Sequence, residues 1–219
     1  MSPDDQPDYA AARRELVERQ LAARGIRDPR VLAAMGRVPR ELFVPVAARS
    51  LAYSDQALPI GFGQTISQPY MVAAACELLG LEGNERVLDI GTGSGYAAAV
   101  LAELATEVLT IERIPELAAS AEAALAEAGY RQVEVRVGDG SLGAPDRAPF
   151  DAIAVAAAAP RVPPALYGQL APGGRLVLPI GTRGDQRLVL VVHTPSGPAV
   201  RRSLPCRYVP LVGAGGFPP

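Results

Sequence analysis

The segment 86–96 reads RVLDIGTGSGY, and it decides the fold. A short apolar run at 86–90 precedes the alternating glycines Gly91, Gly93 and Gly95, and the helical pattern YAAAVLAELA follows them. This order predicts a strand, a tight turn and a helix. Glycines let the backbone turn sharply and approach a ligand closely, because a Cβ would obstruct both. The segment therefore predicts the first strand-to-helix unit of an α/β fold, with a ligand site at its turn.

The same alternation continues toward the carboxyl end. Strand patterns occur at 107–112, 133–137 and 151–156, and helical patterns occur at 115–129 and in VPPALYGQL. Helices of this length between strands imply parallel pairing. The patterns RLVLPIG and RLVLVVHT, the turn PSG and AVRRSL then predict closing antiparallel strands. We expect a doubly wound, mostly parallel, seven-stranded sheet.

The amino-terminal part departs from this alternation. The pattern ARRELVERQLAARG predicts a helix that stops at Gly25, and Asp28 followed by Pro29 predicts the cap and first residue of a helix that closes at Gly36. The stretch 38–62 is interrupted by prolines and glycines, so we expect a connection without regular structure there. The expected organisation is one domain, with a helical extension at 9–62, a core at 63–212 and mobile ends at 1–8 and 213–219.

Composition argues against several classes of partner. The 219 residues carry a net charge of -2, and no Lys/Arg run is long enough to follow a phosphate backbone, so nucleic acid is not expected. No secretion signal is recognisable, and no apolar stretch approaches the ~20 residues that span a bilayer. Cys76 and Cys206 lack metal-ligand spacing. We expect a cytoplasmic monomer with reduced cysteines, no metal and no membrane partner.

Acidic residues end three successive strand patterns, where open α/β sheets bind their ligands. Asp89 can attract a cation such as an α-ammonium group. Glu112 lies about 20 positions beyond the glycine turn, where an acid hydrogen-bonds ribose hydroxyls. Asp139, between Gly138 and Gly140, can accept a hydrogen bond from an exocyclic amine. Together they describe a sulfonium cofactor that has an adenosine ring, a ribose and an amino-acid tail.

Simpler interpretations exist for each element. The glycine turn could be only a tight connection, Glu112 a solvated acid and GDG an ordinary turn. A nicotinamide-dependent oxidoreductase would need G-x-G-x-x-G, but Tyr96 occupies the sixth position counted from Gly91. The occurrence of acids at three successive strand ends favours the sulfonium cofactor.

The segment 57–73, ALPIGFGQTISQPYMVA, carries the most specific signal. It resembles the signature of the protein-L-isoaspartate(D-aspartate) O-methyltransferase family, and VLDIGTGSGY, IER, GDG, APFDAI, LAPGGRLVLPIG and RYVPL follow at the family's spacing. The resemblance runs from about 38 to 211. It implies a class I, Rossmann-like methyltransferase fold, S-adenosyl-L-methionine as cofactor, and an amino-terminal extension that forms part of a lid. The implied partners are damaged proteins or peptides that contain isoaspartyl residues.

The resemblance also implies which residues form the site. Ser67, in the TIS segment, is implied as the active-site residue. The implied cofactor-binding residues are Gln64, Thr65, Ile66, Asp89, Gly91, Gly93, Ser94, Glu112, Asp139 and Gly140. The reaction that follows methylation is implied to pass through a succinimide and back to aspartate.

This chemistry needs few catalytic groups. A carboxylic acid with a pKa of about 4 is already ionised at neutral pH, so no base is needed and positioning dominates. The sole histidine, His193, lies away from the strand ends and is expected to be structural. Ser67 stands where it could cap a helix beginning at Gln68, and it is expected to orient the substrate and not to act as a nucleophile.

Two alternatives remain open at this point. One is a methyltransferase that acts on aspartates of a dedicated peptide substrate. The other is an adaptor that binds the cofactor without turnover, which would show cofactor binding but no methyl transfer. The intact QTIS segment and the strand-end acids argue against the adaptor.

Overall fold

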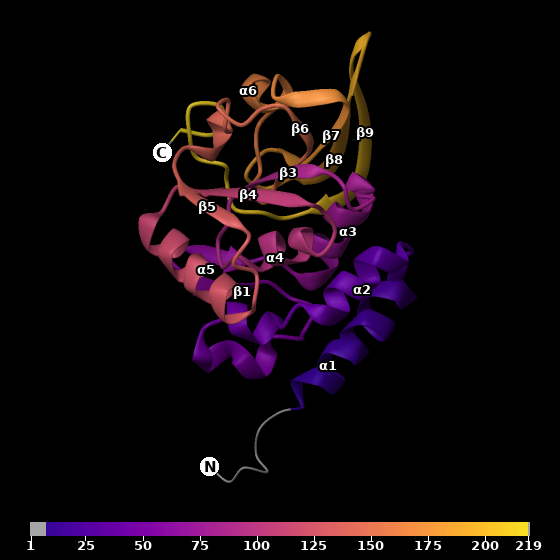
Figure 1. The fold of residues 1–219 in the computed structure, drawn as a ribbon, viewed down its shortest axis with the longest axis vertical. Coiled ribbons are helices and arrows are strands. Elements are labelled where there is room, and N and C mark those ends of the chain that lie inside the picture. Colours follow the sequence, from indigo (N-terminus) through magenta and orange to yellow (C-terminus); the bar gives the residue numbers. More distant parts are fainter. Residues whose placement is uncertain (1–7, 219) are drawn as a thin grey trace.

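A seven-stranded sheet lies at the centre of the protein, which we describe from a computed structural model that covers residues 8–218 (Figure 1). The strand order is β5-β4-β3-β6-β7-β8-β9. Neighbours from β5 to β7 pair in parallel, and β8 and β9 pair antiparallel at one edge. The doubly wound, mostly parallel sheet that the sequence predicts is confirmed. Its strands are β3 (Arg86–Ile90), β4 (Glu107–Glu112), β5 (Glu134–Val137), β6 (Phe150–Val155), β7 (Leu170–Gly181), β8 (Gln186–Thr194) and β9 (Gly197–Cys206).

The sheet is buried on both faces, because its strands alternate between two hydrophobic cores. Val87 packs in the core beneath α3, α4 and α5, whereas its neighbour Leu88 packs in the core on the side of α6. Figure 1 shows α3, α4 and α5 on one side of the sheet and α6 on the other. A continuous apolar strand is typical of parallel sheets covered on both faces. These helices are α3 (Pro69–Leu79), α4 (Tyr96–Ala102), α5 (Pro115–Glu127) and α6 (Pro164–Tyr167).

The amino-terminal extension adds a layer outside α3 and α4 (Figure 1). It contains α1 (Tyr9–Glu15), which continues as one π-helical turn and one 3-10 turn to the expected stop at Gly25, and α2 (Pro29–Arg37). The Asp28 carboxylate accepts hydrogen bonds from the backbone N–H groups of Arg30 and Val31, so the predicted cap is confirmed. The helix α2 runs through Gly36 to Arg37, one residue farther than expected.

The connection at 38–62 is more regular than the sequence indicated. It contains 3-10 turns at Arg40–Phe43 and Val46–Leu51, and the strand β1 (Leu58–Gly61), which pairs antiparallel with β2 (Gln64–Ile66). Phe62, at the tip of this hairpin, has a positive φ of 51°. Sequence patterns missed the hairpin because its strands are very short and Pro59 interrupts the first.

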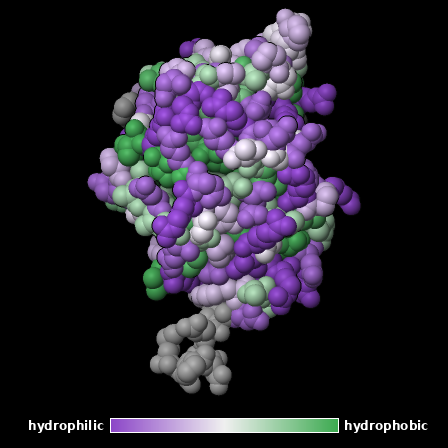
Figure 2. Space-filling view, viewed as in Figure 1, coloured by the Kyte–Doolittle hydropathy of each residue, from purple (hydrophilic) through white to green (hydrophobic). Residues whose placement is uncertain are grey.

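Few large hydrophobic side chains are exposed among the described residues. On the face that Figure 2 shows, hydrophobic residues form small groups among hydrophilic ones. Within the described residues, no helix is both long and apolar enough to cross a membrane. The exposed large hydrophobic residues are Val46, Leu51, Phe62, Val137, Leu142 and Val200.

Candidate active site

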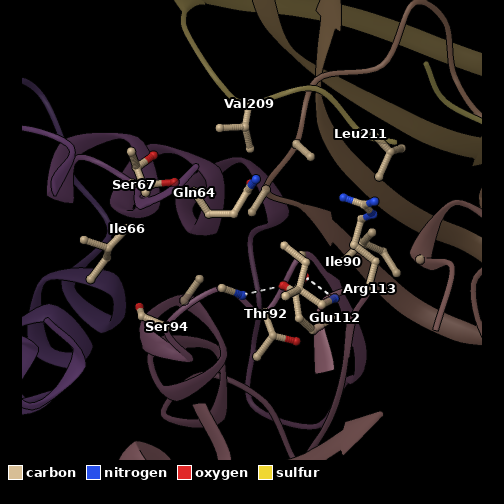
Figure 3. Close-up of a pocket in the computed structure, with 18 of the residues that line it drawn as sticks. Gln64, Ile66, Ser67, Ile90, Thr92, Ser94, Glu112, Arg113, Val209 and Leu211 are labelled. Atoms are coloured by element: carbon tan, nitrogen blue, oxygen red, sulfur yellow. Dashed lines mark hydrogen bonds between the residues drawn. The ribbon is translucent and has the colours of Figure 1, made fainter. Parts of the chain in front are cut away.

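A cavity of about 880 Å³, which includes space open to solvent, lies beyond the carboxyl ends of β3, β4 and β6 (Figure 3). The chain runs from β3 to β4 and β5 on one side and returns to β6 on the other, so this is the topological switch point of the sheet. The predicted site residues that line the cavity are Gln64, Thr65, Ile66, Ser67, Gly91, Gly93, Ser94, Glu112 and Gly140.

The glycine turn connects β3 to α4 in the way that its sequence predicts. Gly91, Gly93 and Gly95 have positive φ values of 91°, 53° and 89°. A Cβ on Gly95 would lie 3.2 Å from Leu125 Cγ, so this glycine allows α4 to approach α5. Gly93 instead borders the cavity, where its missing side chain leaves room for a ligand.

Glu112 joins the end of β4 to the glycine turn. Its side chain is almost fully buried, and Oε2 accepts a hydrogen bond of 2.9 Å from the Gly93 N–H while Oε1 accepts one of 3.0 Å from the Ile114 N–H (Figure 3). A carboxylate has about four acceptor positions, so two remain for ribose hydroxyls. The backbone donors fix the carboxylate where the sequence predicted a ribose contact.

We expect Glu112→Ala to weaken the binding of S-adenosylhomocysteine by about 1–3 kcal/mol, because ribose hydroxyls lose their acceptors. Titration calorimetry measures the change. The matched control is Glu116→Ala, which removes an exposed carboxylate from the first turn of α5. Equal affinities in the two variants would contradict the assignment of Glu112.

Asp89 lies behind the main cavity and does not line it. It borders a smaller adjoining cavity that shares Ser67, Ala97 and Ala156 with the main one. Its Oδ2 accepts a hydrogen bond of 2.7 Å from Thr110 Oγ1, and Oδ1 is buried without a partner among residues 8–218. Burial raises the pKa of Asp89 to about 6, and the charge of Glu112 adds to the rise. The unpartnered oxygen fits a cofactor ammonium group, reached directly or through a water molecule.

Asp139 is not among the residues that line the cavity, and its carboxylate is hydrogen-bonded to the chain itself. Its Oδ1 accepts hydrogen bonds from the Ser141 N–H (2.9 Å) and hydroxyl (2.6 Å), and Oδ2 accepts one of 2.8 Å from the Ala214 N–H. Burial acts to raise the pKa of this carboxyl, but these hydrogen bonds outweigh it and lower the pKa. The carboxylate is therefore occupied by the chain itself, and the adenine contact of Asp139 stays a prediction.

The same hydrogen bonds hold the carboxyl-terminal segment that we expected to be mobile. Besides Ala214, the N–H of Gly215 donates to Ser141 Oγ at 2.8 Å, so part of 213–218 is attached to the turn after β5. We also expected residues 1–7 and 219 to be mobile, and these residues lie outside the described part of the chain.

Ser67 is half-buried and does not cap α3. The helix begins at Pro69 with Gln68 as its N-cap residue, because the residue before a proline is held in an extended conformation (φ -50°, ψ 134° here). Asp55 acts on this helix end instead, since its Oδ1 accepts a hydrogen bond of 3.2 Å from the Tyr70 N–H. No group among residues 8–218 hydrogen-bonds to the Ser67 hydroxyl, which therefore remains available to a ligand.

Several cavity residues were not predicted individually. Arg113 follows Glu112 directly, and Figure 3 shows its guanidinium beside Leu211. The segment from Val209 to Val212 forms another wall of the cavity. The RYVPL motif marked this segment in the sequence, but the motif does not end a strand, so its position at the cavity could not be predicted. His193 fits the expected structural role, since its Nδ1 lies 3.1 Å from the Leu170 carbonyl oxygen and it is not among the residues that line the cavity.

Comparison with known proteins agrees with this geometry. The profile of the protein-L-isoaspartate(D-aspartate) O-methyltransferase family (PCMT) matches residues 11–216. Protein-L-isoaspartate O-methyltransferase 2 of Marinobacter nauticus is 57% identical over 220 residues and both chains are covered completely. Protein-L-isoaspartate O-methyltransferase of Synechococcus is 52% identical, with 96% of this chain and 89% of the relative covered.

The chain belongs to the protein-L-isoaspartate(D-aspartate) O-methyltransferase family.

Solved structures of this family share the fold. One protein-L-isoaspartate O-methyltransferase superposes with a TM-score of 0.83 at 29% identity, covering 93% of this chain and 67% of its own. A Plasmodium falciparum protein in complex with S-adenosyl-L-homocysteine has a TM-score of 0.79 at 25% identity, covering 90% and 96%. Family membership confirms the expected class I fold, methyltransferase activity toward isoaspartyl proteins and S-adenosylmethionine cofactor.

Two further expectations concern cysteines and metals. Cys76 and Cys206 do not form a disulfide in this structure, and their reduced state stays a prediction. Within the described residues, no group of three or more His, Cys, Asp or Glu side chains is arranged to hold a metal ion.

Proposed function

We propose that this chain repairs damaged proteins by methylating the free carboxylate of L-isoaspartyl residues, and also that of D-aspartyl residues. The observation that carries the proposal is the Ser67 hydroxyl, which lines the cofactor cavity without a hydrogen-bond partner in residues 8–218. S-adenosylmethionine, when bound, supplies a methyl group on a positively charged sulfur. The residues suited to hold it are Glu112 for ribose, Asp89 for the ammonium group, and the backbone of Gly91, Gly93 and Gly140.

The chain's own residues act by positioning. An ionised carboxylate needs no general base, and the cavity lining accordingly contains no histidine. Ser67 donates a hydrogen bond to the carboxylate and aligns one of its oxygens with the electrophilic carbon. Gln64 and Thr65, on β2 of the same segment, line the cavity and exclude water from it. Near-attack geometry of this kind can supply roughly 7–11 kcal/mol in intramolecular reactions.

The later steps occur away from the enzyme. A methyl ester is a better leaving group than a free acid, so the neighbouring backbone nitrogen closes a succinimide and releases methanol. Water then opens the ring, and part of the product is normal aspartate.

Matched peptides test the proposal. One peptide contains an isoaspartyl residue and its twin contains aspartate at the same position. We expect methyl transfer to the isoaspartyl peptide only. Methylation of the aspartyl twin would favour a dedicated aspartate substrate, and binding of S-adenosylhomocysteine without turnover of either peptide would favour an adaptor.

Ser67→Ala should lower the rate of methyl transfer by roughly 10- to 1,000-fold and leave measurable activity, because one orienting donor is lost while the nucleophile is intact. Labelled cofactor distinguishes orientation from covalent catalysis, since label would accumulate on a nucleophilic serine. The control is Ser120→Ala, which removes an exposed hydroxyl bonded to its own helix. Because Ser67 does not cap α3, the melting temperature of the Ser67→Ala variant should stay near that of the wild type.

We also propose that the enzyme acts as a monomer in the cytoplasm. The small number of exposed large hydrophobic residues in the described part of the chain supports a monomer, since stable interfaces need larger apolar patches. The two unpaired cysteines support a reducing compartment. Sedimentation at micromolar concentration tests the first statement, and a second species of doubled mass would contradict it.

A further inference from the structure

Arg40 is a fully buried arginine whose side chain contacts two residues of the cavity lining. It begins the 3-10 turn Arg40–Phe43 of the amino-terminal extension and is 0% exposed. Its Nε donates to the Ala52 carbonyl and its Nη2 donates to the Ser67 carbonyl, both at 2.8 Å. The guanidinium carbon lies 4.7 Å from the centre of the Tyr96 ring. Both Ser67 and Tyr96 line the cofactor cavity.

The positive charge of Arg40 has no directly bonded counterion among the described residues. No carboxylate in residues 8–218 forms an ion pair with it, and its Nη1 is buried without a partner. Asp55 acts on it only at longer range, because the Asp55 carboxylate is bound by Arg24, by Gln68 and by the Tyr70 N–H. Burial lowers the pKa of Arg40, but a guanidinium in a protein keeps its proton.

The other ionisable groups around Arg40 are uncharged phenols. Burial raises the pKa of Tyr96 to about 12, and burial together with a hydrogen bond to Glu41 raises the pKa of Tyr53 above its usual value. Neither phenol carries a negative charge at neutral pH. A buried cation without a directly bonded carboxylate is costly, so a carboxylate that arrives from outside would gain from lying near it.

The chemistry of the substrate supplies such a partner. We consider a substrate carboxylate that accepts a hydrogen bond from the Ser67 hydroxyl. Since the Arg40 guanidinium is bound to the carbonyl of the same residue, covalent and hydrogen-bond lengths place the two charges roughly 8 Å apart. At an effective dielectric constant of about 20, a unit charge at this distance changes binding by roughly 30-fold.

We propose that Arg40 is a positioning residue for methyl transfer, which holds Ser67 by its main-chain carbonyl and makes the substrate subsite selective for a negatively charged carboxylate. This inference rests on the proposed function. Arg40 does not touch the reacting atoms. It acts through its hydrogen bond to Ser67 and through the electrostatic field of its positive charge. Because Arg40 belongs to the amino-terminal extension, the extension then takes part in substrate recognition.

Two substitutions separate the effect of the hydrogen bond to the Ser67 carbonyl from the effect of the positive charge. Arg40→Gln keeps a donor for one carbonyl but removes the charge, whereas Arg40→Lys keeps the charge with fewer donors. We expect Arg40→Gln to raise the KM for an isoaspartyl peptide by about 10- to 50-fold and Arg40→Lys to stay within about fivefold of the wild type. The dissociation constant of S-adenosylhomocysteine should change by less than about threefold in both, because the charge acts on the substrate carboxylate.

The control is Arg175→Gln. Arg175 also donates to a main-chain carbonyl, that of Gly80 at 2.8 Å, but it lies outside the cavity lining. This variant should alter the melting temperature without altering KM. If both Arg40 variants lower kcat alike while KM is unchanged, or if Arg40→Gln keeps the wild-type KM, the charge has no role and the proposal is wrong.

A measurement on the wild-type enzyme covers the case in which Arg40→Gln does not fold. The probe is a peptide in which the isoaspartyl carboxylate is replaced by its neutral amide, used as a competitor. We expect it to bind at least about tenfold more weakly than the carboxylate peptide binds. Equal affinities would overturn the proposal although the enzyme is active, whereas an inactive wild-type enzyme would overturn the proposed function itself.

Discussion

Asp89→Asn is expected to stabilise the fold and to weaken cofactor binding at the same time. Asp89 is buried, and burial raises its pKa from 3.8 to about 6. A carboxyl whose pKa is raised on folding contributes stability below its unfolded pKa, and that contribution is lost as the pH rises through the folded value. At pH 8 the charged carboxylate therefore destabilises the fold, by about 3 kcal/mol for a shift of about two units.

Asparagine removes this charge and keeps an oxygen that can accept the hydrogen bond from Thr110. We expect the free energy of unfolding at pH 8 to rise by about 1–3 kcal/mol, and the gain to disappear below about pH 4, where the wild-type carboxyl is neutral as well. Urea unfolding at both pH values measures this. A variant less stable than the wild type at pH 8 would contradict the role of burial.

The cofactor affinity should change in the opposite direction. Without the negative charge, the positively charged ammonium group loses an attraction of roughly 2–3 kcal/mol, or about 30- to 150-fold in affinity. In the wild type the affinity should likewise fall as the pH drops through about 6, and in Asp89→Asn this dependence should be absent. Asp185→Asn, at an exposed position between β7 and β8, is the control for a change of net charge.

Gly93→Val is expected to abolish cofactor binding while the protein still folds. Gly93 has a φ of +53°, which a β-branched residue adopts only with strain, and a Cβ there would lie 3.4 Å from Ile60 Cδ1. The added methyl groups would enter the space that the glycine leaves at the cavity. We expect the affinity for S-adenosylhomocysteine to fall by more than about 100-fold, from loss of a close backbone approach.

The control Gly129→Val separates two effects of Gly93→Val, the filling of the cavity by a side chain and the backbone strain at a positive φ. Gly129 also has a positive φ, of 91°, but a Cβ there meets nothing within 4 Å. This control should lower the melting temperature as Gly93→Val does and should bind cofactor normally. Wild-type turnover of Gly93→Val would show that the glycine serves only the turn between β3 and α4.

The local elements of the core were predictable from the sequence. The strand, glycine turn and helix around 86–96, the acid at the end of β4 and the cap at Asp28 depend on residues near one another in the chain. Hydrophobic periodicity, glycine conformation and capping act over a few residues, so a sequence displays them directly. The QTIS segment could be recognised as a motif, although its strand β2 could not.

What only the tertiary structure decided concerns partners that are distant in sequence. Asp139 is bound by Ala214, 75 residues away, and Asp55 takes the place at the end of α3 that a local rule gave to Ser67. Arg40 lies 27 residues from the carbonyl that it holds. The sequence alone determined which residue types stand at the ends of the strands. Packing of the extension and the tail determined which of their polar groups stay free for a ligand, because hydrogen bonds between distant segments form only when the chain brings them together.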